Sequence, residues 1–273
     1  TNRPYIFRLT EPKGEEGKAD LFLSQIQNKS TFDLDILLEV EGSPIIYWKK
    51  ADVIGLLGNS EKISQRFFSG GRLKTHGDDK FLRFHWEVSR KKLGAKWRKL
   101  SHGGGIRRWY GNTIRVVDWG PDAKEHYATH GGLPNLRLDG RVGVTTTKIA
   151  YENAFRIKEA DELYSSLAPT VFPKESSEEL NIDALINMNS SLGKDVLSTL
   201  NPTMTVNVGD MLAVPFVSFS QNERDLAKFL ISEYKEDWDS SEISIDFSRH
   251  IMAQGVEAKI ATRYERVRSN WEN

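Results

Sequence analysis

The sequence predicts a mixed α/β fold, in which a twisted sheet carries flanking helices and is followed by a helical C-terminal segment. Short runs rich in β-branched residues, separated by many glycines, fill residues 61–219 and indicate strands. Apolar stripes spaced by three or four residues, at 181–200, 221–238 and 256–271, indicate helices. The length of 273 residues suffices for one large or two modest domains with a buried core.

The first sixty residues contain two expected strands, a loop and a helix. Apolar runs at 5–9 and 33–40 indicate the strands, and the polar segment at 11–18 indicates the loop. The segment "GSPIIYWKKADVIGLLGNS" (42–60) indicates a helix that begins near its proline and ends at Gly58 and Asn59. Its apolar side comprises Ile46, Tyr47, Val53, Ile54 and Leu57.

Four further runs are expected to form strands: "IRVVDW" (114–119), "GRVGVTTTKIA" (140–150), "PTMTVNV" (202–208) and "MLAVPFVSF" (211–219). One long helix interrupts them at 181–200, because Leu185, Met188, Leu192, Val196 and Leu200 recur at helical spacing. The helices at 221–238 and 256–271 then form the C-terminal segment.

The composition excludes several classes of protein. There is no cysteine, which rules out disulfides, thiolate metal sites and a cysteine nucleophile, and which fits a reducing cytoplasm. No segment approaches the roughly 20 apolar residues that cross a bilayer, so we expect a cytoplasmic protein without a membrane partner. The chain opens with Thr1 and no leader, and we expect it to be a fragment of a longer protein.

Motifs for catalysis are missing. The sequence has no Pro-Pro dipeptide, and therefore no Asn-Pro-Pro-aromatic motif of adenine-amino methyltransferases, and it has no glycine-rich nucleotide loop or G-x-S-x-G elbow. His126 and His130 have the i, i+4 spacing of two zinc ligands, but the glutamate of the zinc-protease motif and a third ligand are missing. The E-x-K triplets at 11–13 and 257–259 match a nuclease pattern that charged chains often produce by chance. We assign no catalytic, metal or cofactor residue.

The net charge of zero conceals a segregation of charge. Residues 62–115 contain fifteen Lys and Arg but only three acids, so the remainder of the chain carries the opposite excess. Such a one-sign stretch attracts polyanions, although a solvated surface without a partner is the plainer alternative. Aromatic residues interleave with these cations, which favours a nucleic-acid partner. We expect the cations to lie together on one open surface.

The segment "GGGIRRWYGN" (103–112) combines flexible backbone, cations and aromatic rings. Three glycines allow close approach of backbone N–H groups to phosphate, and Arg107 and Arg108 have the planar geometry for phosphate oxygens or guanine. Trp109 and Tyr110 are suited to stack on a base, but packing beneath the turn is the alternative for this pair. These features alone fit RNA or single strands as well as duplex DNA.

An ordered set of motifs covers residues 40–248. These are "GSPIIYW" (42–48), "GGRLKTHGDDKFLRFHWEV" (70–88), "GGGIRRWYGN" (103–112), "VVDW" (116–119), "LNPTMTVNVGDMLAVP" (200–215) and "KEDWDSSEISIDF" (235–247). In this order they resemble blocks in the C-terminal half of PglX-type adenine-specific DNA methyltransferases, which belong to BREX phage-defence systems and are related to type IIG restriction-modification enzymes. Ile106 departs from the pattern, since the family usually carries an aromatic residue there.

The resemblance implies a division of labour along the chain. Residues 59–220 would form a target recognition domain, with a twisted sheet and flanking helices, that grips double-stranded DNA and selects the adenine site. Residues 1–58 would connect it to a methyltransferase domain outside this chain, where S-adenosylmethionine binds, and residues 221–273 would form a C-terminal helical segment. Residues 120–175 correspond to the stretch where family members diverge, so specificity loops are expected there.

The candidate DNA contacts come from the basic stretch and its glycine loop. They are Arg72, Lys74, Lys80, Arg83, Lys96, Arg98, Gly103, Gly104, Gly105, Arg107, Arg108, Trp109, Tyr110 and Asn112. Two other classes of function stay open. The same basic face is suited to dock another phage-defence protein or a DNA-mimicking inhibitor, which random duplex DNA would displace poorly. A nuclease that uses the scattered acids is the weaker alternative.

Overall fold

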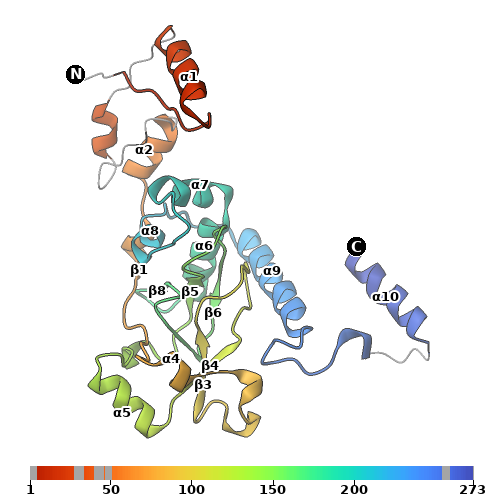
Figure 1. Ribbon diagram of the computed structural model, residues 1–273. Coiled ribbons are helices and arrows are strands. Elements are labelled where there is room, and N and C mark those ends of the chain that lie inside the picture. The colour runs from red at the N-terminus through yellow and green to blue at the C-terminus, as the bar shows by residue number, and fades with distance from the viewer. Residues whose placement is uncertain (1–4, 28–33, 40–45, 47–50, 254–258, 273) are drawn as a thin grey trace. The chain divides into compact units, whose positions relative to one another are not determined.

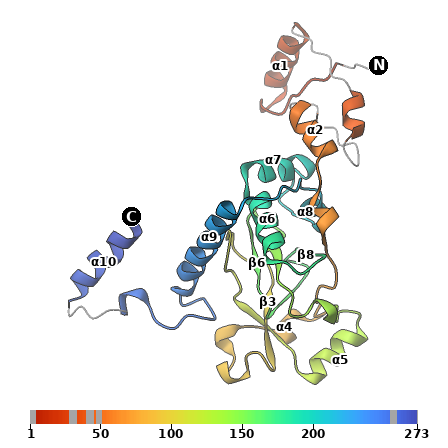
Figure 2. The same ribbon diagram turned by 180° about the vertical axis from the view of Figure 1, so that it is seen from behind.

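The computed structural model describes residues 5–27, 34–39, 46, 51–253 and 259–272. In this part of the chain it has ten α-helices and two four-stranded sheets, which confirms the predicted mixed α/β class (Figures 1 and 2). The chain divides into two compact units, Thr1–Lys62 and Ile63–Asn273. The predicted three-part division at residues 58 and 220 stays a prediction. No helix in the described ranges is long and apolar enough to span a bilayer.

The first unit is helical. Its elements are α1 (Glu15–Gln27), the 3-10 helix η1 (Leu34–Glu39) and α2 (Ala51–Asn59). The strands expected at 5–9 and 33–40 are therefore wrong, because the leucines of the second run recur at helical spacing rather than alternating. Residues 11–14 of the loop expected at 11–18 are irregular, whereas residues 15–18 begin α1, whose first turn carries acids that favour a helix N-terminus.

The core of the first unit includes Leu37 of η1 and Ile54 and Leu57 of α2, all buried. The end of α2 agrees with the stop predicted at Asn59. The preceding part of the predicted helix, 42–45 and 47–50 with Tyr47, lies outside the described residues.

The second unit contains both sheets. One sheet has the order β1-β8-β5-β6, and the other has the order β2-β4-β3-β7. The strands are β1 (Phe67–Phe68), β2 (Leu82–Phe84), β3 (Trp97–Ser101), β4 (Arg115–Asp118), β5 (Gly143–Thr146), β6 (Phe155–Lys158), β7 (Glu162–Tyr164) and β8 (Thr170–Pro173). All neighbours pair antiparallel except β3 and β7, where Leu100 lies beside Leu163 in parallel register. The runs at 114–119 and 140–150 are thus confirmed as strands.

The strands expected at 202–208 and 211–219 are wrong. Val208–Leu212 forms the short helix α8, and the rest is irregular apart from isolated bridges. Asn207 and Asp210 close a capping box, in which Asn207 N donates to Asp210 Oδ2 at 2.8 Å. This capping signal overrides the β-branched composition of the segment.

Helices cover the sheets of the second unit. The helix expected at 181–200 is two helices, α6 (Glu178–Asn189) and α7 (Ser191–Leu200). Ser190 separates them because its Oγ accepts a hydrogen bond from Gly193 N at 2.9 Å and so begins α7. The helix α6 lies against β5, β6 and β8, as Figure 1 shows. Of the predicted apolar stripe, Leu185 and Met188 of α6 and Val196 of α7 are buried, whereas Leu192 is exposed.

The remaining helices complete the second unit. They are α3 (Ile63–Arg66), α4 (Asp78–Phe81), α5 (Pro121–Thr129), α9 (Gln221–Asp239) and α10 (Ile260–Glu272), with 3-10 turns η2 (His85–Glu87), η3 (Arg90–Lys92), η4 (Leu136–Leu138) and η5 (Ile251–Ala253). The predicted helix at 221–238 is confirmed as α9, and that at 256–271 as α10 from Ile260 onward. Tyr127 of α5 packs with Val117 and Leu163 in the core of the β2-β4-β3-β7 sheet.

A buried ionic group joins the two sheets. Arg156 and Lys158 of β6 are each 1% exposed and interact electrostatically with the buried Glu162 of β7. Ser101 and Thr113 each donate a hydrogen bond of 2.8 Å to the Glu162 carboxylate, and Lys158 Nζ donates to the Arg141 carbonyl at 2.8 Å. Burial lowers the pKa of Lys158 to about 8 and raises the pKa of Glu162.

Candidate nucleic-acid interface

The glycine-rich segment predicted to meet phosphate forms the connection between β3 and β4. Asn112 braces it from inside: its Nδ2 donates to the carbonyls of Gly103 at 3.0 Å and of Gly105 at 2.8 Å. The backbone has positive φ at Gly103, Gly104 and Gly111 and also at Trp109 and Asn112. The Asn112 side chain is buried, so in this structure it shapes the loop rather than extending from it.

The two aromatic residues of the loop differ in burial, since Trp109 is half-buried and Tyr110 is buried. Trp109 N donates to the Phe155 carbonyl at 2.8 Å, and Ile157 N donates to the Trp109 carbonyl at 3.0 Å, so the loop extends the sheet beside β6. Tyr110 is buried beside α9, where the Lys235 Nζ lies 3.2 Å from its hydroxyl and 4.7 Å from its ring centre. Burial raises the pKa of Tyr110. For Tyr110 the structure favours the packing alternative.

Several of the predicted DNA-contact cations bind carboxylates of the acidic remainder. The pairs are Arg98–Asp139 at 2.7 Å, Arg107–Asp237 at 2.6 Å, Lys96–Asp118 at 3.6 Å and Arg108–Glu152. Lys99, in the same stretch, lies 3.1 Å from Asp161 and 3.2 Å from Asp246. The expectation that the whole surplus lies free on one open surface is therefore wrong, because folding brings the acidic remainder to these cations.

Other predicted contacts carry no such pair. The exposed Arg72, Lys74 and Lys80 have no carboxylate within 4.0 Å among the residues that the structure describes. Arg83 is half-buried and donates to the backbone carbonyls of Asp79 at 2.8 Å and Leu82 at 2.6 Å. Arg72, Lys74 and Lys80 are therefore the predicted cations whose charge is most available to an external anion.

A hollow of about 350 Å³ brings Arg72 together with a cation from a distant part of the chain, Lys148. No acid is present among the described residues of its wall, which are Ser69, Gly70, Arg72, Lys148, Tyr164, Ser165, Ser166, Ala168, Pro169, Thr170, Asn207, Val208 and Gly209. A second hollow of about 290 Å³ shares Ser165 and Ser166 with the first and adds Lys74 and His102. The two hollows are therefore adjacent, and the second also has the acid Asp78 in its wall.

Backbone hydrogen bonds fix the walls of the first hollow. Gly71 has a φ of 73°, and a Cβ there would lie 2.4 Å from the Cβ of Asn135, so only glycine fits the turn that presents Arg72. Leu73 N donates to the Tyr164 carbonyl at 2.8 Å. At Lys148, which also lines the hollow, the backbone N donates to the Leu167 carbonyl at 3.0 Å.

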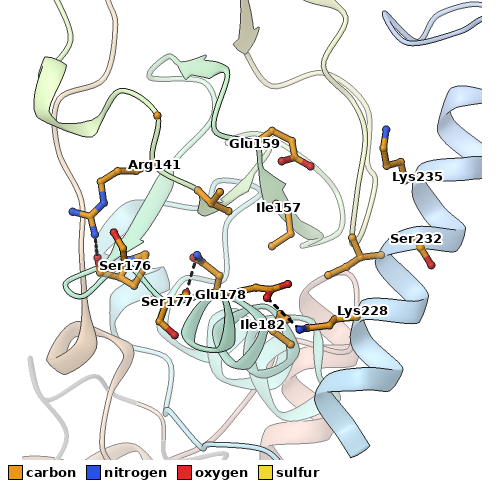
Figure 3. Close-up of a pocket in the computed structure, with 15 residues that line it drawn as sticks. Arg141, Ile157, Glu159, Ser176, Ser177, Glu178, Ile182, Lys228, Ser232 and Lys235 are labelled. Atoms are coloured by element: carbon orange, nitrogen blue, oxygen red, sulfur yellow. Dashed lines mark hydrogen bonds and ion pairs between the residues drawn. The ribbon is translucent and has the colours of Figure 1, made fainter. Parts of the chain in front are cut away.

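A larger cavity than these two lies elsewhere, between β6, α6 and α9, and measures about 700 Å³ (Figure 3). Val142, Ile157, Ile182 and Ile231 make most of its exposed wall area apolar, although its wall also carries charged side chains, namely Arg141, Glu159, Glu178, Lys228 and Lys235. Figure 3 shows Lys228 reaching across to Glu178, which it approaches to 3.2 Å. Apolar walls and a paired lysine make this cavity a poor match for a phosphate backbone, although it is the larger one.

Two predicted candidates for other chemistry have structural positions. His126 and His130 stack on α5 with ring centres 4.1 Å apart, and His130 Nδ1 lies 2.8 Å from the His126 carbonyl. In the described ranges, no group of three or more His, Asp or Glu is placed to hold a metal ion. The E-x-K triplet at 257–259 lies partly outside the described residues.

Sequence reasoning did not identify Lys148 or Ser166. Lys148 follows three threonines after β5 and lies outside the basic stretch, in the segment expected to hold specificity loops. The available signal was the position of Lys148 just beyond the end of β5. Arg72, which lines the same hollow, is far away in the sequence, so the sequence did not indicate that the two cations share a site.

The comparisons with known proteins agree with the motif resemblance. No protein-family profile matches the chain. The chain is 30% identical over 257 residues to the adenine-specific methyltransferase BrxX of Escherichia coli O9:H4 (strain HS), an alignment that covers 91% of this chain and 21% of the relative. It is 26% identical, over an alignment of 290 residues, to the adenine-specific methyltransferase PglX of Lacticaseibacillus casei (strain Zhang), covering 91% of this chain and 23% of the relative. The chain therefore spans less than a quarter of the length of either protein.

Proposed function

This chain is a homologue of part of the BrxX and PglX adenine-specific methyltransferases, and from that relationship we propose that it recognises double-stranded DNA for an adenine methyltransferase. In this proposal it selects the site at which the parent enzyme, acting in a BREX or restriction-modification system of a bacterium or archaeon, methylates adenine N6. An enzyme of this type extrudes the target base from the duplex, so a separate recognition module must hold the flanking DNA.

One observation carries the proposal: Arg72, Lys74 and Lys80 are exposed and have no carboxylate partner among the described residues, in a chain whose net charge is zero. In a protein of zero net charge, cations that no acid of the chain neutralises mark the surface at which electrostatic attraction to a polyanion is strongest. The hollows beside Arg72 and Lys74 add hydroxyl groups that suit phosphate oxygens.

The methyl-transfer chemistry is assigned to the parent enzyme outside these 273 residues. The chain has no Asn-Pro-Pro-aromatic motif and no glycine-rich nucleotide loop. S-adenosylmethionine would therefore bind in another part of the parent, and the chain alone would bind DNA without modifying it.

The test is duplex binding by the 273-residue chain as a function of salt. If about six to ten phosphates are contacted, affinity should fall by roughly 10³ to 10⁵ between about 50 and 200 mM salt. Random duplex should compete, and a duplex that contains the methylation site of the parent should bind more tightly. Failure to bind duplex DNA, or an affinity that does not depend on salt, would contradict the proposal.

A protein-docking role is the second candidate, because α9 exposes large apolar side chains. Leu226 and Phe229 are 59% and 57% exposed and lie three residues apart on one side of the helix. Such a patch suits another phage-defence protein, whereas a DNA-mimicking inhibitor would instead use the cations. Pull-down of a defence-complex protein that random duplex fails to displace, and that Phe229→Ser abolishes, would favour docking.

A further inference from the structure

We propose that the hollow between Arg72 and Lys148 binds a phosphate group, and that this phosphate is a phosphodiester of the DNA backbone. The identity of the ligand as DNA rests on the proposed function, while the phosphate chemistry rests on the hollow itself. In this proposal the main contact to the DNA backbone is made by Arg72 and Lys148 instead of Arg107 and Arg108. Lys148 lies outside the basic stretch of residues 62–115 and binds phosphate nevertheless.

The charges of the hollow favour an anion. Arg72 offers a planar fork of N–H donors, and Lys148 offers a compact ammonium on a flexible stem. No described carboxylate lies within 4.0 Å of either side chain, and no described acid lines the hollow. An incoming phosphate would therefore displace only water, whereas a phosphate at Arg107 would have to replace the bond to Asp237.

The neutral groups of the hollow show where the phosphate oxygens would be held. Ser69 Oγ donates to the Thr170 carbonyl at 2.5 Å, the Tyr164 hydroxyl donates to the Gly70 carbonyl, and Ser165 Oγ accepts from Leu167 N. The O–H donors of Ser69 and Tyr164 are therefore used within the wall, whereas the buried Ser165 hydroxyl is used there as an acceptor. Ser166, in contrast, is exposed and has no hydrogen-bond partner within the described part of the chain.

Arg72, Lys148 and Ser166 thus supply three kinds of hydrogen-bond donor to one hollow. No carboxylate among the described residues of its wall accepts from them. A tetrahedral phosphate presents several acceptor oxygens, which matches that set. The adjacent hollow also has Ser166 in its wall and adds Lys74, which is a further cation for a neighbouring phosphate. Asp78 is the acid among the described residues that line this second hollow. It lies 3.5 Å from His102, and its negative charge offsets part of the positive charge of Lys74.

The walls are held before any ligand arrives. Lys148 is fixed at its backbone on both sides, because its N donates to Leu167 and its carbonyl accepts from Val206 N at 2.8 Å. The backbone of Gly71 packs closely against Asn135, and this contact fixes the turn that carries Arg72. A preformed site loses less conformational entropy on binding than a flexible arm of cations would.

The test uses the full 273-residue chain and a fluorescent duplex, with Arg72→Ala, Lys148→Ala and Ser166→Asp as variants. Lys228→Ala is the matched control, because it removes one positive charge at the apolar cavity, away from this hollow. Each alanine variant should raise the Kd by about tenfold and should lower the slope of log K against log salt by about one. Ser166→Asp places a carboxylate in the hollow and should weaken binding further, and thermal melting verifies that every variant is folded.

The outcomes separate the site from the function. If the wild type binds with a steep salt dependence and both alanine variants behave like Lys228→Ala, the hollow is not a contact and the proposed function stands. If the wild type binds no duplex, the proposed function fails, and the DNA assignment fails with it. Inorganic phosphate is the second probe: stabilisation of the wild type but not of Arg72→Ala, with DNA binding equal in the two, would identify a free-phosphate site and overturn the backbone assignment.

Discussion

Arg107 of the glycine loop and Asp237 of α9 form an ion pair with 2.6 Å between Arg107 Nη2 and Asp237 Oδ2. The guanidinium also lies 4.9 Å from the ring centre of Trp238, so one face of it is covered by an aromatic ring. The loop that was predicted to face DNA is therefore tied to a helix of the C-terminal segment. The exposed fraction of the Asp237 side chain is 61%, which places the pair in the solvent-screened regime.

Asp237→Asn should release the charge of Arg107 and tighten duplex binding. A solvent-exposed ion pair stabilises a protein by about 0–1 kcal/mol, so its loss should barely change the melting temperature. The freed guanidinium should lower the Kd by about twofold to fivefold at low salt, and the gain should vanish at high salt. Fluorescence anisotropy at two salt concentrations measures this, with Asp225→Asn on the same helix as the control. Weaker binding by Asp237→Asn would show that the pair positions the loop for DNA instead of competing with it.

The double variant Arg107→Ala with Arg108→Ala should weaken duplex binding by at least about 1 kcal/mol while the fold stays intact. Both arginines now pair with acids, but exposed pairs are weak enough for a phosphate to replace the carboxylate. The loss should be smaller than that for Arg72→Ala with Lys148→Ala, whose charges have no described competitor. Equal binding of a folded double variant and the wild type would remove both arginines from the interface.

The sequence predicted elements best where one apolar period dominates. The buried stripe of α6 and the run of Val116 and Val117 in β4 have that character: β4 forms as expected, and the segment 181–200 is helical as expected although Ser190 divides it into two helices. At 202–219 the β-branched composition was the weaker signal, because the Asn207 and Asp210 capping box begins a helix there. Strands as short as β1, with two residues, carry too little pattern to be found in this way.

The candidate site shows a different limit. Composition revealed a surplus of cations, but the availability of each charge depends on which acids folding brings near it. Asp139 and Asp237 are remote in sequence from the arginines that they bind, and Lys148 meets Arg72 only in the tertiary structure. A charge count along the chain identifies the class of partner, whereas the contacting residues depend on packing.

Asn112 is predicted to be a structural residue of the loop. Asn112→Ala should destabilise the fold by about 1–3 kcal/mol, since the Gly103 carbonyl is buried and would lose its donor. The φ of Asn112 is 74°, so part of this cost is backbone strain. Asn112→Gly separates the two effects because glycine tolerates that φ while also losing both hydrogen bonds. Urea unfolding should place the glycine variant between the wild type and the alanine variant, and a glycine variant as stable as the wild type would assign the whole effect to φ.

Lys158 should give the protein an unusual dependence of stability on alkaline pH. Burial lowers its pKa to about 8 in the folded state, below the ordinary value of 10.5 for a lysine. Between these values the unfolded chain binds more protons than the folded one, so the free energy of unfolding should rise as the pH increases from about 8. Lys158→Met should remove that rise and should stabilise the protein at pH 7 by about 1 kcal/mol or more, because no buried ammonium then has to be desolvated.

Urea unfolding at pH 7, 8 and 9.5 tests this. Glu162 keeps Arg156 and its two hydroxyl donors in the Lys158→Met variant, so the carboxylate is not left alone. Lys228→Met is the control, since the Lys228 side chain is 39% exposed and its loss should leave the pH profile unchanged. If the wild type loses stability between pH 8 and 9.5 and Lys158→Met does not, the ammonium is stabilised by Glu162 and the Arg141 carbonyl more than burial penalises it.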